Sequence, residues 1–599
     1  MAPAHLRLGT VGGVSAPFIA IDGEAAEGDY TLLACSDGRT LTDLAPEGLH
    51  THMCLEFLLR TPKPAVPVCF GLNYDVNNWL RDLPRHTLKA LWETHVCYWR
   101  SFRIEWVPGR WFSIGDTDGR RVKVHEVFGF FQTSFVKALE DWSIGQPAEI
   151  SRMKGQRGDF KRADIDPVTR YCLKECELLV TLMDALRGAC EDSGVVPRSW
   201  IGAGATAMAL LSKHVDYDHH AYDLDLASEQ VVEDAVLGAY YAGRIELLRQ
   251  GVYHHVKTAD LRSAYPAAAT ALPSLDGARL INRKRFDPGK HGVWRVEWKF
   301  DSHPSPLLAP FPVRQKHRIH YPLAGSGWYH TIEVATAIEL GYPVDVKEGW
   351  ILKGGSDAQP FDWIPAVYKE RAKLKTAGAP AEKVLKLALN SCYGKLAQGY
   401  GFNSRPKWQC YLWAGEITAA TRARMLRAAV AVTDPLMIST DGIFCRGLPH
   451  SIRDSAELGR WEIGDVDELF TAQAGVYQGI TPERTYVKSR GFYAREVDYD
   501  QLREGWESEG HRYTHIYDSR RFIGLGVALM RKDFGVWRKW VDEKRAIHLS
   551  PERKGIQADC LTPPAGPLDS EPYVPKLSLT DQKALDQMQG MDQPLKESM

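Results

Sequence analysis

The chain of 599 residues is too long for one ordinary hydrophobic core and is expected to fold as about three to five domains. Its 44% hydrophobic and 25% charged residues are typical of a soluble globular protein, and no apolar stretch is long enough to span a bilayer. The 11 cysteines form no C-x-x-C pair, and no signal-peptide pattern is present, so we expect a cytoplasmic protein without zinc or disulfide frameworks. Because the net charge is −1, a nucleic-acid protein of this composition would need locally concentrated positive charge.

Near the amino terminus, the stretch FIAIDGEAAEG (18–28) is an apolar strand that carries Asp22 and Glu24. Residues i and i+2 of a strand point to the same face, so these two carboxylates would lie side by side. They would repel one another unless a cation lay between them. Oxygen-rich sites of this kind suit Mg²⁺ or Mn²⁺.

Two later stretches also place an acid where a strand ends. Residues 251–266, GVYHHVKTADLRSAYP, begin as an alternating strand and end near Asp260. Residues 437–445, MISTDGIFC, predict two short strands joined by a tight turn, with Asp441 at the tip. Such an acid either caps its own turn or is neutralised by a partner or a metal, and the sequence of the turn alone favours the cap.

The helical stretch 380–398 places a cation, an amide and an aromatic ring on one stripe, as Lys386, Asn390 and Tyr393, followed by Gly394. One interpretation is a buried helix whose lysine reaches solvent at its tip. The other is a platform for a charged, planar ligand, with lysine on phosphate and the ring on a base or sugar.

Positive charge is concentrated in residues 511–554, which hold 11 Arg or Lys against 5 Asp or Glu, with Trp537 and Trp540 among them. A solvated helix face and a surface that follows phosphates are both consistent with this amphipathic, basic pattern. In the phosphate interpretation, Arg538 and Lys539 contact the backbone of a duplex. Residues 560–599 are rich in proline and polar residues and predict a loosely ordered tail.

Three of these stretches together resemble the motifs of family B DNA polymerases. K-x-x-x-N-S-x-Y-G from Lys386 resembles the fingers motif, DLRSAYP from Asp260 resembles the first palm motif, and STDG occupies the place of the second. The three occur in the family's order, and the resemblance reaches from about residue 17 to about residue 495. One departure is Ser439, which stands where the family usually has an acid.

For the polymerase site, the resemblance implies that Asp260 and Asp441 hold two Mg²⁺ or Mn²⁺ ions and that Tyr265 excludes a ribose 2′-hydroxyl. It implies that the nucleotide contacts Lys386, Asn390 and Tyr393, with Arg371 as a further triphosphate candidate. In TYVKSRGF, Lys488 would lie near the primer phosphates.

The resemblance extends to a 3′→5′ exonuclease domain with two further metal ions. It implies catalytic roles for five residues, of which the first three would hold metal: Asp22, Glu24, Asp75, Tyr171 and Glu175. Glu175 stands where aspartate is usual, and Gly71 replaces an asparagine for which Asn73 is a candidate substitute. In FFQTSFVKAL, the candidates for contact with single-stranded primer are Phe131, Ser134 and Phe135. For each of these residues alone, packing in a core is the competing interpretation.

AYYAGRIE resembles the segment that joins exonuclease to palm, with Tyr240 and Gly243 as DNA-contacting residues. This segment and the compact length resemble the protein-primed polymerases of phages and linear plasmids, which carry two insertions. The interval from Asp260 to Lys386 has room for the first, whereas that from Asn390 to Asp441 is short for the second. The implied partners are primer-template DNA, deoxynucleoside triphosphates and a terminal protein or other replication proteins, with no membrane. The implied location is the host cell cytoplasm if the protein is viral.

We therefore expect a mixed α/β (α+β) fold and a template-directed DNA polymerase with a 3′→5′ proofreading exonuclease. The competing hypotheses are a nuclease with a decayed polymerase half and a non-catalytic DNA-binding protein. The expected domains are an exonuclease domain (1–195), a linker with the first part of the palm and an insertion (196–354), fingers (355–400), the second part of the palm (401–497), a thumb (498–559) and the tail (560–599).

Overall fold

The structure is a computed structural model that describes residues 16–145, 147–215, 230–300, 308–315, 318–399, 406–549 and 568–569. Apart from residues 568–569, the predicted tail lies outside the described residues, and so does the start of the predicted exonuclease domain, residues 1–15. Within the described ranges, no helix is both long and apolar enough to cross a membrane.

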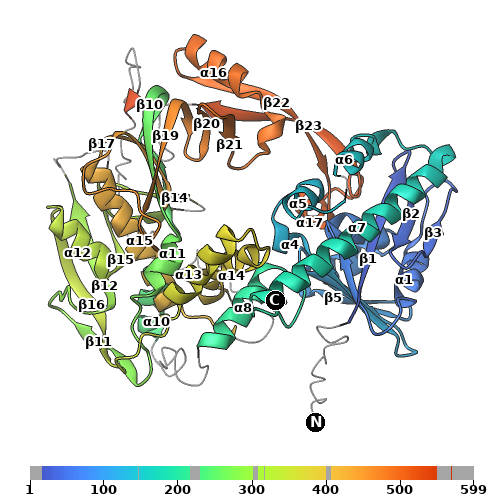
Figure 1. The fold of residues 1–599 in the computed structure, drawn as a ribbon, viewed down its shortest axis with the longest axis horizontal. Helices are drawn as coiled ribbons and strands as arrows, with labels where there is room; N and C mark the ends of the chain where they lie inside the picture. The colour runs from blue at the N-terminus through green and yellow to red at the C-terminus, as the bar shows by residue number, and fades with distance from the viewer. Residues whose placement is uncertain are drawn as a thin grey trace.

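The first sheet has eight strands and lies at the right of Figure 1. Its spatial order is β3 (Thr40–Thr42), β2 (Asp29–Cys35), β1 (Phe18–Ala26), β4 (Val66–Cys69), β8 (Arg121–Glu126), β7 (Trp111–Gly115), β6 (Phe102–Val107) and β5 (Val96–Trp99). β4 pairs in parallel with β1 and β8, and the other neighbours are antiparallel.

The alternation of β1 gives each face of the first sheet its own core. Ile19 and Ile21 belong to one core, which contains residues of α1 (Thr51–Leu59), α2 (Leu72–Trp79) and α3 (Arg85–Thr94). Phe18 and Ala20 belong to the other, which contains residues of the long helix α7 (Ile165–Asp192). The even positions of β1, Asp22 and Glu24 included, therefore lie on the α7 side of the sheet. The chain between β8 and α7 forms short helices: α4 (Phe128–Phe131), α5 (Phe135–Asp141), α6 (Pro147–Gly155), η1 (Arg157–Asp159) and η2 (Arg162–Asp164).

The second sheet is antiparallel and lies at the left of Figure 1. Its order is β21 (Thr485–Lys488), β20 (Val476–Ile480), β19 (Trp461–Gln473), β10 (Arg249–Leu261), β18 (Gly442–Gly447), β17 (Thr433–Thr440) and β9 (Arg244–Leu247). β24 (Leu568–Asp569) pairs with the start of β10. The strand predicted to end near Asp260 and the hairpin predicted around Asp441 are neighbours here, as β10, β18 and β17.

The interval between Asp260 and Lys386 contains a third sheet, in the order β11 (Ala278–Arg283), β16 (Val344–Gly354), β12 (Gly292–Lys299) and β15 (Ala324–His330). A short hairpin, β13 (Val313–Gln315) with β14 (Arg318–His320), and helix α12 (Thr331–Glu339) complete this insertion. The described part of the interval from Asn390 to Asp441 is filled mainly by the end of α14 and by α15, so it holds no comparable sheet.

The remaining helices lie between the sheets or follow them along the chain. They are α8 (Ala203–His214), α10 (Gln230–Gly238), α11 (Ala264–Ala269), α13 (Ile364–Thr376), α14 (Ala381–Leu396), α15 (Tyr411–Ala431) and, after the second sheet, η4 (Ala494–Glu496) and α16 (Tyr499–Ser508). Figure 1 shows α8, α13 and α14 between the sheets. α14 matches the helix predicted for residues 380–398.

The described part of the basic stretch, residues 511–549, is mostly strand, and the helix-face interpretation is wrong there except for α17 (Leu525–Arg531). β22 (Tyr513–Phe522) and β23 (Trp540–Leu549) form an antiparallel pair with Tyr513 opposite Leu549 and Phe522 opposite Trp540. The buried positions of β22 alternate, which is the period of a strand, and they pack against α16. In Figure 1 this pair runs across the top of the molecule, from the second sheet to the first.

Candidate active sites

The first site lies on the second sheet, where Asp260 and Asp441 are brought together. Asp260 is the penultimate residue of β10 and pairs in register with Gly442, the residue after Asp441. A Cβ atom on Gly442 would lie 1.9 Å from Oδ1 of Asp260, so only glycine allows this approach. Thr440 turns the hairpin with φ of 63°, and the Asp441 N–H donates to the carbonyl of Ser439 at 2.8 Å. Partial desolvation and the charges of Asp441 and Glu462 raise the pKa of Asp260 to about 6. Desolvation also raises the pKa of Asp441.

Beside these acids is a cavity of about 420 Å³. Five predicted site residues line it: Tyr265, Arg371, Lys386, Asn390 and Asp441. They come from α11, α13, α14 and the hairpin, so residues far apart in sequence share one cavity. Nε of Arg371 contacts Oε1 of Glu382 at 2.7 Å. Lys375, one helical turn after Arg371, and Glu462, which pairs in register with Asp260, line the cavity too, and the sequence analysis did not single them out.

A cluster of three tyrosines joins the segment before the second sheet to the helix α14. The hydroxyls of Tyr240 and Tyr393 are 2.7 Å apart, and the rings of Tyr265 and Tyr393 are centred 4.7 Å apart. A Cβ on Gly243 would lie 2.7 Å from both Thr440 and the hydroxyl of Tyr265, so this glycine permits close packing. The structure therefore brings Tyr240 and Gly243 to the edge of the first site.

Arg422 of α15 fixes this segment and was missed by the sequence analysis. Its guanidinium donates to the carbonyls of Tyr241 and Ala242 and, at 2.8 and 2.9 Å, to both oxygens of Glu333. Both side chains of this ion pair are almost fully buried. An arginine on the apolar side of a helix was the available signal, because a buried charge requires partners.

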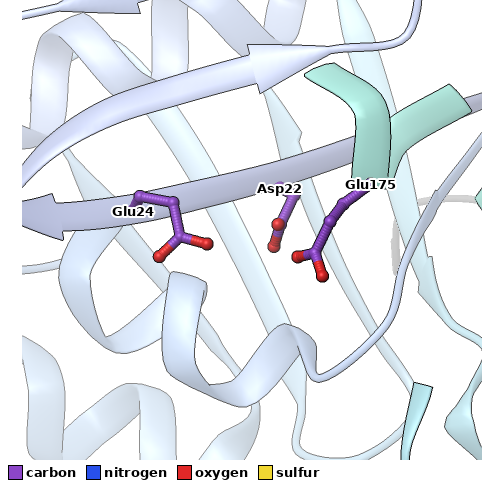
Figure 2. A group of neighbouring side chains, drawn as sticks. All are labelled: Asp22, Glu24 and Glu175. Carbon is purple, nitrogen blue, oxygen red and sulfur yellow. The ribbon is translucent and has the colours of Figure 1, made fainter. Parts of the chain in front are cut away.

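The second site lies between β1 and α7. Asp22, Glu24 and Glu175 offer carboxylate oxygens that all lie within 4.8 Å of one another. Figure 2 shows the carboxylates of Asp22 and Glu175 pointing toward each other, with Glu24 farther along the strand that carries Asp22. Glu24 and Glu175 are each only 4% exposed. Glu175, predicted to be catalytic, completes the group, so its longer side chain is accommodated here.

Asp75, predicted as the third metal ligand, is not a member of this three-carboxylate group. It is 1% exposed, and its Oδ1 accepts a hydrogen bond from the hydroxyl of Tyr30 at 2.7 Å. Tyr171, also buried, lies on α7 one helical turn before Glu175. Gly71 is the N-cap of α2 with φ of 94°, and its N–H donates to Glu126.

Oδ1 of Asn73, the candidate substitute for the missing asparagine, accepts from the N–H of Gly109 at 3.1 Å, and its role as that substitute stays a prediction. The role of Asp75 as a metal ligand stays a prediction.

Lys154 and a set of aromatic rings complete the second site. Nζ of Lys154 lies 2.8 Å from Oε1 of Glu175 and 5.1 Å from the ring centre of Phe135. Lys154, Phe135 and Phe70 line a small cavity of about 40 Å³ beside Asp22 and Glu175. The ring of Phe70 is 5.2 Å from that of Phe135 and 6.0 Å from that of Phe131. Lys154 and Phe70 were missed because only the tertiary fold brings α6 and the end of β4 to β1.

The other predicted DNA contacts have different surroundings. The hydroxyl of Ser134 caps α5 by accepting from the N–H of Lys137. Lys488 is exposed on β21, at the edge of the second sheet. Lys539 is exposed, whereas Arg538 is half-buried, and desolvation together with the charge of Arg81 lowers its pKa. Arg538 therefore lies near Arg81, which follows α2, rather than in open solvent.

Both acid groups suit hard divalent cations, because each gathers carboxylate oxygens from separate elements of the fold. In the first group, desolvation and the neighbouring charges raise the pKa of Asp260, and a cation would relieve the repulsion between the acids. In the second, three carboxylates crowd within one small volume, and Lys154 pairs with one of them. The first group adjoins a cavity that holds cationic side chains, as a triphosphate would need.

Comparisons with known proteins agree with the motifs. Residues 149–404 match the family described as DNA polymerase type B, organellar and viral. A DNA polymerase of Acidianus bottle-shaped virus (isolate Italy/Pozzuoli) is 34% identical over 145 residues, which are 24% of this chain and 21% of the viral protein. The primer-independent DNA polymerase PolB of Escherichia coli is 24% identical over 316 residues, which are 45% of this chain and 35% of that protein. The matched regions thus span about a fifth and a third of these relatives.

Among solved structures, Phi29 DNA polymerase complexed with primer-template DNA superposes with a TM-score of 0.60 at 14% identity. The match covers 89% of this chain and 100% of that one. The ternary complex with primer-template DNA and incoming nucleotide gives 0.58 at 13% identity, covering 89% and 99%. These matches confirm the predicted mixed α/β fold and the resemblance to compact phage-type family B polymerases.

Proposed function

We propose that this chain, which has the sequence motifs and the fold of compact phage-type family B DNA polymerases, is a template-directed DNA polymerase with a 3′→5′ exonuclease. The observation that carries the proposal is the meeting of Asp260 and Asp441 beside a cavity lined by Lys386 and Arg371. Acids for metal ions and cations for a triphosphate are the two requirements of nucleotidyl transfer.

At the polymerase site, Asp260 and Asp441 would hold two Mg²⁺ or Mn²⁺ ions through their carboxylates. The chemistry supplied by these ions is activation of the primer 3′-hydroxyl and stabilisation of charge during in-line displacement of pyrophosphate. Lys386 and Lys375 bind the triphosphate from α14 and α13, and Arg371 lines the same side of the cavity. Gly442 keeps the two acids close, so their spacing is set by the backbone pairing of β10 with β18.

Nucleotide selection would rest on the tyrosine cluster. Tyr265 lines the cavity, and its packing against Tyr393 and Gly243 fixes the ring in place. A fixed ring at this position rejects a ribose 2′-hydroxyl by occupying its space. Asn390, exposed on the same face of α14 as Lys386, lies within reach of the incoming nucleotide.

At the exonuclease site, Asp22, Glu24 and Glu175 would hold two further ions, with Asp75 as a more distant candidate. Lys154 holds the carboxylate of Glu175 in place, and Tyr171 orients the attacking water. Phe131 and Phe135 pack around Phe70 and offer faces on which the bases of a single-stranded 3′ end can stack. The small cavity suits a strand end better than a duplex.

The domain limits, the partners and the location complete the proposal. The first sheet and α7 fit an exonuclease domain that ends near residue 195, and β22 with β23 fits a thumb within 498–559. The third sheet stands where the protein-primed relatives carry their first insertion, so a terminal protein is a candidate partner. We place the activity in the cytoplasm of a host cell, with Lys488 and Lys539 on the primer-template backbone.

The proposal is tested by extension of a labelled primer on a template with Mg²⁺ and all four deoxynucleotides. The parent protein should extend the primer, and Asp441→Asn should lose several orders of magnitude in rate while binding the same DNA, because its carboxylate acts on the metal ions. If the parent protein bound the DNA but did not extend the primer, a non-catalytic DNA-binding protein would be favoured. Degradation without extension would favour a nuclease with a decayed polymerase half.

The match to the primer-independent E. coli polymerase raises a second candidate, which is synthesis that begins without a primer. The same assay with template and nucleotides alone tests it. Products in the parent that are absent in Asp441→Asn would support it, whereas a requirement for primer would exclude it under those conditions.

A further inference from the structure

The third sheet, which lies below the second sheet in Figure 1, shares a hydrophobic core with it. Trp294 of β12 and Tyr329 of β15 are buried in one cluster with Ala259 of β10 and Ile443 of β18. β10 and β18 are the strands whose pairing brings the two acids of the first site together. The insertion is therefore built into the unit that carries this site and is not a separate appendage.

The short hairpin of the insertion, β13 with β14, reaches the segment that precedes the second sheet. Nη2 of Arg314, in β13, donates to the carbonyl of Tyr240 at 2.9 Å. The same guanidinium lies 5.2 Å from the ring centre of Tyr241. Val313, the residue before it, is buried in the shared core and pairs with His320 of β14. The hairpin thus presents the guanidinium of Arg314 to the backbone just before β9.

A tyrosine of the third sheet holds this hairpin against the segment. The hydroxyl of Tyr329 donates to the carbonyl of Pro312, two residues before Arg314, at 2.7 Å. The ring of Tyr329 is stacked on that of Tyr241, with centres 5.8 Å apart and planes inclined by 9°. One side chain therefore fixes both the root of the hairpin and the neighbour of the carbonyl that Arg314 contacts.

The segment needs donors of this kind because residues 240–243 lie between α10 and β9, outside the helices and strands. Arg314 supplies a donor to the carbonyl of Tyr240. Arg422 supplies donors to the next two carbonyls, those of Tyr241 and Ala242. Two arginines from different elements, the insertion and α15, thus hold three consecutive carbonyls.

The held segment bears on the cavity of about 420 Å³ at the first site. The hydroxyl of Tyr240 lies 2.7 Å from that of Tyr393, and the ring of Tyr393 is centred 4.7 Å from that of Tyr265, which lines the cavity. A Cβ on Gly243 would lie 2.7 Å from the Tyr265 hydroxyl, so the segment also packs directly against that ring. A shift of the segment would therefore disturb the wall of the cavity.

We propose that Arg314 is a positioning residue for nucleotide selection, which sets the place of Tyr240 and, through Tyr393, that of Tyr265. Arg314 does not itself line the cavity, so it acts through these tyrosines. The inference rests on the proposed function, because it requires that the cavity bind an incoming deoxynucleoside triphosphate. It gives the insertion a part in the reaction itself, beyond contact with a candidate terminal protein.

The test compares Arg314→Met with Arg279→Met in the addition of a single nucleotide. Methionine keeps the apolar stem of Arg314 but has no donor, and Arg279, exposed on β11 of the same sheet, is the matched control. A less firmly held Tyr265 should bind the nucleotide less well and reject a ribose less strictly. We expect the KM for deoxynucleotide to rise about tenfold, kcat to change by less than about twofold, and the preference for deoxy- over ribonucleotides to fall about fivefold. Binding of primer-template without nucleotide should be unchanged.

Two further variants test the route of the effect. Arg314→Lys keeps a donor for the Tyr240 carbonyl without the planar guanidinium, so it should recover most of the loss in KM. In a Tyr393→Phe background, which lacks the hydroxyl contact, Arg314→Met should change KM by less than about twofold, because residues acting in one chain of contacts are not additive. A lysine variant as defective as the methionine variant, or the full effect in both backgrounds, would contradict this route.

The outcomes separate this inference from the proposed function. If the parent extends primers and Arg314→Met has the same KM and the same nucleotide preference as Arg279→Met, the inference is overturned and the polymerase assignment stands. If the parent itself adds no nucleotide, the proposed function fails, and the inference with it. Should Arg314→Met fail to fold, as judged by its thermal unfolding, Arg314→Ala carries the same predictions against Arg279→Ala.

Discussion

The two carboxylate sites of this chain differ in depth and in counter-charge. Asp260 is exposed beside a cavity of about 420 Å³, whereas Glu24 and Glu175 are buried and only Asp22 and Glu175 line the second site's cavity of about 40 Å³. In the buried site Lys154 already pairs with Glu175 at 2.8 Å, whereas desolvation and the neighbouring acids raise the pKa of Asp260. An open site must admit a triphosphate and a base pair and depends on bound cations, whereas a closed site must only admit a strand end. In the proposed function, the same residue type would serve two reactions because its surroundings differ.

The largest effect that separates the sites is expected from Gly442→Ala. The new Cβ would lie within 1.9 Å of Oδ1 of Asp260, so the carboxylate must rotate away although the fold can persist. Because displacement of a catalytic group by about 1 Å can cost roughly a hundredfold, primer extension should fall by at least about a hundredfold. Degradation of single-stranded DNA by the same protein should be unchanged. Extension near the parent rate would show that the spacing of the two acids is not critical.

A smaller effect, confined to the buried site, is expected from Glu175→Asp. The shorter side chain withdraws the carboxylate by about 1.5 Å, one carbon–carbon bond, from Asp22 and from Lys154. We expect single-strand degradation to fall by about tenfold to a hundredfold, with extension of a matched primer unaffected. Faster degradation would mean instead that glutamate at this position is a handicap and that the group seen in Figure 2 is not the working arrangement.

The smallest effect concerns pH. Because the pKa of Asp260 is raised to about 6, this carboxyl becomes neutral as the pH falls through that value and is charged above it. A proton on Asp260 competes with Mg²⁺, so lowering the pH from about 7 to about 5 should raise the Mg²⁺ concentration needed for half-maximal extension about tenfold. Mg²⁺ titrations at constant ionic strength measure this, with DNA binding in the absence of Mg²⁺ as the control. An unchanged requirement would show that Asp260 stays charged throughout the range.

Local sequence was sufficient for the elements that hold the acids. The apolar run of residues 18–21 and the two-residue spacing of Asp22 and Glu24 predicted a strand with both acids on one face, and β1 has that form. The turn around Asp441 and the helix that carries Lys386 follow equally from turn chemistry and periodicity.

What could not be predicted depends on contacts between distant segments. Lys154 reaches Glu175 only because α6 folds back on α7. Asp75 accepts a hydrogen bond from Tyr30, whose place in the sheet is set by the pairing of β2 with β1. The basic stretch misled because charge does not distinguish a strand pair from a helix, and nothing in it indicates that Trp537 donates to Asn77. Long-range packing of this kind is not encoded in any window of the sequence.

The most direct test of two separate reactions in one chain uses a labelled primer with a mispaired 3′ end, assayed with Mg²⁺ and with or without deoxynucleotides. The parent should shorten the primer without nucleotides and, with them, remove the mispair and then extend. Asp22→Ala should lose the shortening by several orders of magnitude but extend a matched primer at the parent rate, and Asp260→Asn should only shorten. If either substitution abolished both activities in a protein that is folded and binds DNA, the account of two independent sites would be contradicted.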